Sequence, residues 1–272
     1  MDLKHLDNIP PWEWPEDTGQ QLFNFLNDTA PEHPDRLTAV ALAGDYTVIN
    51  NALAARLLEI VNSDKESEAV RSRAAIALGP TLEHAYVMGF DDPDDILISK
   101  TVFTSIQNSF HDLYLASDGS KLMRRRILEA AVRAPQAWHF EAVKTAYNSG
   151  DDEWQLTAVF CMAYIDGFES EILEALHSSD FYMHYHAVCA AGIWELDAAW
   201  DHIAELVLTE KGDKDIRIAA IEAAATIRPH ETGVLFSDLW ESEDEDILDA
   251  LHEAMLAVRG ALDLADEDAT VL

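Results

Sequence analysis

A cluster of aromatic and histidine side chains is the part of the sequence best suited to chemistry. The run Tyr182-Met183-His184-Tyr185-His186 comes shortly after His177 and before His202. Histidine is a common metal ligand, but two ligands on one helix face must be three or four residues apart. His184 and His186 are two residues apart, which places them about 200° apart around a helix. We therefore expect no metal shared by these two histidines, and we expect His186 to cap or pack in the core while His184 and Tyr185 point toward a groove.

The other reactive residue types do not form a catalytic pattern. Cys161 and Cys189 each lie among small apolar residues, which predicts buried thiols rather than a disulfide or zinc ligands. The sequence has no Gly-rich phosphate loop and no serine in a strand-turn-helix elbow. The acidic run at 91–95 does not have the spacing of an EF-hand calcium loop, so we interpret it as a solvated loop. The sequence thus predicts no catalytic residue, no cofactor and no metal.

The charge balance excludes a simple nucleic-acid-binding protein. The 272 residues include 51 Asp and Glu but only 18 Lys and Arg, which gives a net charge of −33 and a pI near 4.4. A surface that binds phosphate backbones needs clustered basic residues, and the one dense run is 124–126 after Lys121. We therefore expect no direct binding of nucleic acid. The acidic surface has two possible explanations, adaptation to salt and recognition of a partner.

Hydropathy predicts a chain outside the membrane. No segment approaches the roughly 20 apolar residues that a membrane span requires. Residues 1–14 lack the basic start and apolar run of a signal peptide. We therefore expect a cytoplasmic location and no contact with a membrane.

The elements that would position these residues belong to a helical repeat. One sequence motif, with small residues at helical spacing, occurs seven times and is clearest at 70–79. The residues equivalent to Ala74 are Ala39, Ile127, Ala158, Ala187, Ala220 and Leu251. Successive copies are 29 to 35 residues apart, except for a step of 53 residues between Ala74 and Ile127. A second amphipathic segment lies between the copies, so each repeat is a pair of helices.

The boundaries of these helices have sequence signals of their own. Asp151, Asp180 and either Asp213 or Asp215 are positioned as N-caps. The glycines expected to end helices are Gly44, Gly79, Gly150 and Gly192. The small residues at the repeated alanine positions predict close approach of neighbouring helices. We divide the chain into an extended N-terminal cap at 1–16, a solenoid at 17–260 with a loop insertion near 89–95, and an acidic flexible tail at 261–272.

The phrase Val70-Arg71-x-x-Ala74-x-x-Ala77-Leu78-Gly79 resembles the second helix of HEAT repeats. It is most similar to the short repeats of phycobilisome lyases and deoxyhypusine hydroxylase, and the resemblance covers about 20–260. It implies an all-α fold, a right-handed α-α superhelix of about six to seven helix pairs. Since this fold supports many functions, the resemblance gives almost no information about activity.

The resemblance also implies which residues face a partner. In HEAT arrays the second helices line a concave face, which would place Arg71, Arg124, Gln155, His184 and Arg217 in one register there. We expect Trp154, Tyr185 and His184 to form an aromatic patch that anchors a partner on that face. The His-Glu pairs that bind iron in deoxyhypusine hydroxylase are missing from the equivalent positions. The pairs at 230–231 and 252–253 fall elsewhere, and a di-iron site needs more than one fitting pair.

Three functions are compatible with these features. We favour a non-catalytic scaffold or adaptor that binds an unidentified protein partner. The alternatives are an enzyme or enzyme accessory of the HEAT-like lyase type, and an acidic DNA mimic or other nucleic-acid-related HEAT protein. The sequence gives no oligomeric state.

Overall fold

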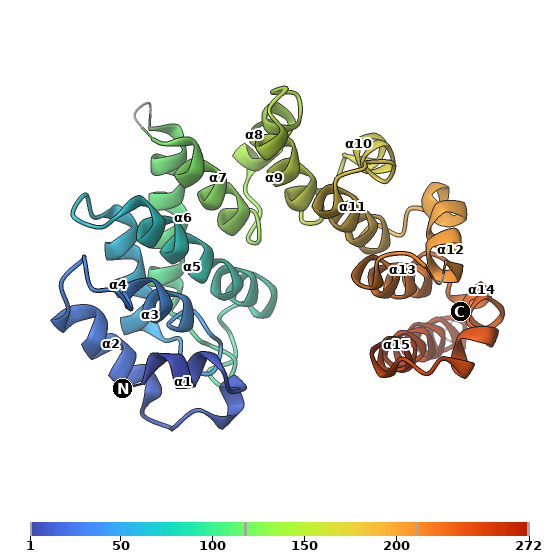
Figure 1. Ribbon diagram of the computed structural model, residues 1–272, viewed down its shortest axis with the longest axis horizontal. Coiled ribbons are helices and arrows are strands. Elements are labelled where there is room, and N and C mark those ends of the chain that lie inside the picture. Colours follow the sequence, from blue (N-terminus) through green and yellow to red (C-terminus); the bar gives the residue numbers. More distant parts are fainter. Residues whose placement is uncertain (1, 117–118, 210, 271–272) are drawn as a thin grey trace. The chain divides into compact units, whose positions relative to one another are not determined.

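The chain is entirely helical in the part that its structure, a computed structural model, describes. Residues 2–116, 119–209 and 211–270 are described, with side chains to Gly260. These residues form fifteen α-helices and three short 3-10 helices, without a strand (Figure 1). The all-α prediction is confirmed. The chain divides into two compact units, Met1–Ala142 and Val143–Leu272.

The first unit contains two layers of helices. One layer holds α3 (Arg36–Leu42), α5 (Glu68–Met88) and α7 (Lys121–Ala131). The other holds α2 (Thr18–Asp28), α4 (Asn51–Asn62) and α6 (Lys100–Leu115). Each helix of one layer packs against its partner in the other and against its own neighbours, so the unit is a stack of helix pairs.

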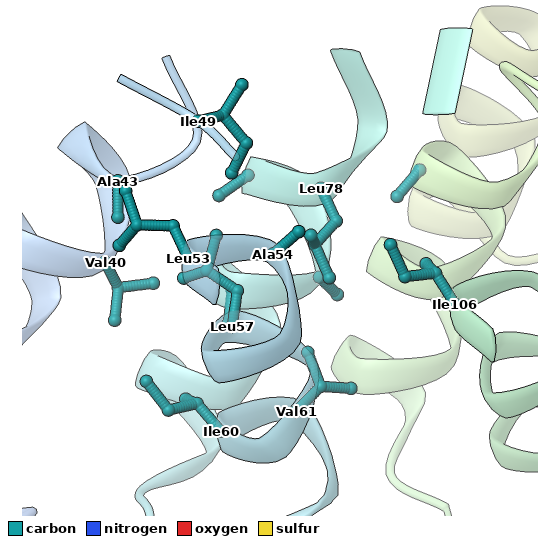
Figure 2. Packing of buried hydrophobic residues seen from close by; sticks show 14 of the residues in the cluster. Val40, Ala43, Ile49, Leu53, Ala54, Leu57, Ile60, Val61, Leu78 and Ile106 are labelled. Carbon is teal, nitrogen blue, oxygen red and sulfur yellow. The ribbon is translucent and has the colours of Figure 1, made fainter. Parts of the chain in front are cut away.

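The core of the first unit lies between its two layers. Leu53 and Leu57 of α4 and Leu78 of α5 are fully buried. In Figure 2 these side chains converge with Val40 of α3, and Ile106 extends the cluster toward α6. No single pair of helices can enclose these side chains. The favourable free energy of burying them therefore depends on the stacking of successive helix pairs.

The second unit repeats this arrangement. One layer holds α9 (Asp152–Met162), α11 (Phe181–Ile193), α13 (Lys214–Ile227) and α15 (Glu245–Thr270). The opposite layer holds α10 (Glu169–Ala175), α12 (Trp200–Leu208) and α14 (Pro229–Leu235). Helix α8 (Ala137–Tyr147) crosses the boundary between the units. The remaining elements are α1 (Leu3–Asp7), η1 (Pro11–Glu13), η2 (Asp197–Ala199) and η3 (Ser237–Glu241).

Five of the second helices begin in the same way. Asp151 and Asp180 accept a hydrogen bond from the backbone N–H of the third residue of α9 and α11. Asp213 does so for α13, which decides between the two candidates at that helix. Ser67 and Ser120 accept the equivalent hydrogen bond in α5 and α7. These caps satisfy N–H groups that a helix leaves without an internal partner, and they fix where these five helices begin.

A buried ion pair joins the first helix pair of the first unit to the loop that leads into α5. Arg36 is 1% exposed, and its Nε donates to the two carboxylate oxygens of Glu66 at 2.9 and 2.8 Å. Its Nη1 donates to the carbonyl oxygens of Leu26 and Thr29, both at 3.2 Å. Removing one partner of such a pair costs roughly 3–5 kcal/mol, so this contact holds α2 and α3 together.

Two glycines expected to end helices lie inside them instead. Gly79 is within α5 and Gly192 is within α11. A Cβ at Gly192 would lie 2.8 Å from the Cα of Ala223 in α13, and one at Gly79 would lie 3.3 Å from the Cα of Ala130 in α7. These glycines are therefore explained by close helix approach rather than by termination. Gly150, with φ +70°, follows α8 as expected.

Both ends of the chain differ from the prediction. Residues 3–7 form α1 and residues 11–13 form a 3-10 helix, so the N-terminal segment is not extended. Leu3 and Leu6 are buried on the first unit, and the Trp14 indole N–H donates to the Leu6 carbonyl at 3.0 Å. At the other end, α15 continues to Thr270, because Ala, Leu and Glu favour the helix. The backbone at 261–270 is thus helical, the flexibility of the tail stays a prediction, and 271–272 lie outside the described residues.

The remaining predictions about architecture have separate outcomes. The loop insertion is present, because α5 ends at Met88 and α6 begins at Lys100. The residues equivalent to Ala74 are all fully buried, in agreement with the predicted seam. No helix in the described part of the chain is long and apolar enough to cross a bilayer. The right-handed superhelix and its concave face stay predictions.

Candidate functional site

The five residues predicted to share a register occupy equivalent places in the structure. Each is the fourth residue of its helix, one position after the residue whose N–H is capped. They are Arg71 of α5, Arg124 of α7, Gln155 of α9, His184 of α11 and Arg217 of α13. The first two belong to the first unit and the other three to the second.

Three of these side chains have an internal role that sequence reasoning missed. Arg71 Nε donates to the carbonyl of Val61 at 2.9 Å, and Arg217 Nε donates to the carbonyl of Val207 at 2.9 Å. Gln155 Nε2 donates to the carbonyl of a residue at the end of α8, Tyr147, at 3.2 Å. In each case the second helix of a pair satisfies a C-terminal carbonyl of the first. We call these residues the clasp.

Arg124 and His184 have other neighbours. The stem of Arg124 lies close to Gly119, where an added Cβ would be 3.2 Å from its Cγ. His184 directs its Nε2 toward Nε2 of His202, a residue of α12, at a distance of 3.0 Å. His184 is therefore not part of an aromatic patch with Tyr185, although the two residues are adjacent in sequence.

A pocket of about 390 Å³ lies instead on the side of α11 that faces the start of α13. Its lining consists of Phe181, Tyr182, Tyr185, His186, Asp215 and Ile218. The first four follow the spacing i, i+1, i+4 and i+5, which is one face of a helix. Tyr182 and His186 therefore share a face. We call this the α11–α13 pocket.

The aromatic rings of the α11–α13 pocket have two orientations. Phe181 and Tyr185 are stacked, with centroids 6.2 Å apart and an interplanar angle of 22°. Tyr182 is edge-on to Phe181, with centroids 5.0 Å apart and an angle of 78°. Tyr182 is 60% exposed, so one ring of the pocket is open to solvent.

The electrostatic environment of the pocket is negative. The Cys189 thiol raises the pKa of the Tyr185 hydroxyl above its usual value, and burial, Glu222 and Asp215 act in the same direction. Tyr185 and Cys189 also share a hydrogen bond. Asp215 is exposed at the rim, and it is not the capping residue of α13, since Asp213 has that role. The carboxylate of Asp215 is therefore available to a ligand.

The pocket does not coincide with the predicted aromatic patch, and Tyr185 is the one residue that belongs to both. Trp154 and His184 are not among its lining residues, while Phe181, Tyr182, Asp215 and Ile218 are. The sequence signal that could have identified these residues is the helical face at 181–186 together with the first residues of α13, which is the second helix of the following repeat. The contribution of α13 could not be read from the sequence, because Asp215 lies one full repeat after the pocket residues of α11.

The cysteines, the other histidines and the acidic loop do not join the α11–α13 pocket. Cys161 and Cys189 form no disulfide, and the first is fully buried and the second partly so. His230 begins α14 and His252 lies on α15, where its ring contacts Trp240. In the acidic loop, the backbone N–H of Asp94 donates to the side chain of Asp92 at 3.0 Å, which is a local turn.

Comparisons with known proteins give a distant likeness in fold. No family model matches the chain, and no curated protein matches it. Among solved structures it is similar to human deoxyhypusine hydroxylase in complex with glycerol. That match has 12% sequence identity and a TM-score of 0.41, and it covers 95% of this chain and 97% of that chain. The helix-pair fold described above is established by the chain's own contacts.

Proposed function

We propose that the chain is a non-catalytic protein-binding scaffold or adaptor that uses the α11–α13 pocket to hold a cationic side chain of its partner. The observation that carries the proposal is the pocket of about 390 Å³ bounded by three aromatic rings and one exposed carboxylate. Aromatic faces attract cations through their quadrupole, and a carboxylate adds a direct charge.

The charge of the whole chain favours the same partner chemistry. A net charge of −33 repels acidic partners and accelerates encounter with basic ones. The polar clasp groups Arg71, Gln155 and Arg217 are engaged in joining helices, so the aromatic pocket is the better anchor. A basic protein segment that presents an arginine or a lysine fits both observations.

The test uses small probes rather than an unknown partner. N-acetyl-arginine amide, tetramethylammonium and the neutral N-acetyl-norleucine amide are titrated into the labelled full chain and followed by NMR. We expect both cations to shift the signals of Tyr185, Asp215 and Ile218, while the neutral probe does not. Tyr182→Ala should weaken binding roughly two- to fivefold, because an exposed cation–π contact is worth about 0.5–1 kcal/mol. Asp215→Asn should weaken binding by a similar factor, because it removes the carboxylate charge that attracts the cation.

The matched control is Tyr86→Ala, which removes an exposed tyrosine of α5 that is not in the pocket. Binding should be unchanged in this variant. Equal shifts from the neutral probe, or an equal loss of affinity in the control, would rule out a cation pocket.

A further inference from the structure

Three histidines meet at a point outside the α11–α13 pocket. Nε2 of His184 in α11 is 3.0 Å from Nε2 of His202 in α12, and the ring centroids are 5.2 Å apart. His177, just beyond the end of α10, places its ring 5.1 Å from that of His202 at an angle of 79°. Two helices and the segment after α10 thus bring imidazoles into contact with the ring of His202 or provide that ring.

The distance between the two nitrogens suits a shared metal ion. With metal–nitrogen bonds of about 2.0–2.1 Å, a separation of 3.0 Å corresponds to an angle of roughly 95° at the metal. A tetrahedral site would need the nitrogens only about 0.3 Å further apart. Without a metal, the same contact is a hydrogen bond between two neutral rings, in which one Nε2 carries the proton.

We propose that His184, His202 and His177 bind one divalent transition-metal ion of the zinc type, which ties α11 to α12 and to the end of α10. The described residues contain no group of three or more His, Cys, Asp or Glu side chains already spaced as a ligand set. His177 is exposed, so its side chain turns toward the other two on binding. Water occupies the fourth position, and Glu205 supplies a negative charge beside His202.

The test is a titration of the purified full chain with Co²⁺, followed by visible absorption and by competition with Zn²⁺. We expect one ion per chain, with loss of binding in His184→Ala and in His202→Ala. Even groups outside the ligand shell change metal affinity roughly 10- to 100-fold, so His177→Ala should weaken binding at least about tenfold. His230→Ala, which removes an exposed histidine of α14 in the same unit, should bind as the original chain does.

A second measurement reports the rings directly. In ¹⁵N NMR the metal-free pair should show one protonated Nε2, whereas Zn²⁺ should convert both rings to the Nδ1–H form. Circular dichroism checks that each variant is folded. Failure of the chain to bind Co²⁺ would overturn the proposal, as would unchanged binding in His202→Ala or full affinity in His177→Ala, whose exposed side chain can be removed without disturbing the core.

Discussion

His139, at the start of α8, is fully buried and keeps its ring neutral. Its Nδ1 accepts a hydrogen bond from the backbone N–H of Gln136 at 2.8 Å, and its ring centroid is 3.9 Å from that of Trp138. Burial, with a smaller effect of His111, lowers the pKa of His139 from 6.5 to about 3. A charged imidazole is thus strongly disfavoured in the folded chain.

This shift predicts how stability depends on pH. Below about pH 6.5 the unfolded chain binds a proton at His139 that the folded chain does not bind. The free energy of unfolding should therefore fall by about 1.4 kcal/mol per pH unit from this residue, down to a pH of about 3.

The variant His139→Asn keeps an acceptor for Gln136 and removes the titration. Urea unfolding at about pH 7.5, 6.5 and 5.5 should show the advantage of the original chain shrinking only below about pH 6.5. If the difference in unfolding free energy between the two chains is independent of pH, the pKa of His139 is not lowered by folding.

At the scale of the helices, the close approach of α11 and α13 depends on one missing methyl group. A Cβ at Gly192 would lie 2.8 Å from both Cα and Cβ of Ala223, which is closer than real Cβ atoms come. Gly192→Ala should therefore destabilise the chain by about 1–3 kcal/mol through overpacking, although alanine is the better helix former.

Gly233 is the matched control for this prediction. It lies inside α14, and a Cβ there would meet no atom within 4 Å. Gly233→Ala should stabilise the chain by up to about 1 kcal/mol, as expected from helix propensity alone. Urea unfolding of both variants checks the pair. If Gly192→Ala stabilises the chain as much as Gly233→Ala does, the two helices are not in tight contact.

The elements also show how far sequence reasoning reaches. The N-caps Asp151 and Asp180 and the buried seam were predictable, because caps and small residues act locally and recur with the repeat. Gly79 was wrongly expected to end a helix, because Gly79-Pro80 is a strong local stop signal. Helix α5 continues to Met88 because Leu82 is buried by packing, and tertiary contacts outweigh local propensity.

The candidate site was less predictable than the fold. Tyr185 was predicted to contact a partner, but Phe181 was not noticed and Tyr182 was only named in the aromatic run, since the side of α11 that meets α13 depends on packing. The partner of His184 was also hidden. His202 follows it by 18 residues, and the repeat pattern gives arginine or glutamine, not histidine, at the place equivalent to His184 in most other copies.

For the molecule as a whole, charge is the dominant property. With a net charge of −33, repulsion among carboxylates opposes the compact state. Exposed ion pairs such as Lys214 with Asp244, at 2.9 Å, are weakened by solvent and do not offset that repulsion. Salt screens both effects, and the repulsion is the larger because it involves many more groups.

Salt should therefore stabilise the folded chain. The Debye length falls from about 10 Å at 0.1 M to about 3 Å at 1 M, so most of the repulsion is screened within this range. We expect the Tm to rise when KCl is increased from about 0.05 M, with most of the rise below about 0.3 M, where the Debye length changes fastest. Thermal melts in potassium thiocyanate separate screening from effects of the anion on burial, because both salts screen equally at low concentration. A Tm that falls with KCl would show that attraction between opposite charges outweighs the repulsion, and the acidic surface would then not oppose folding.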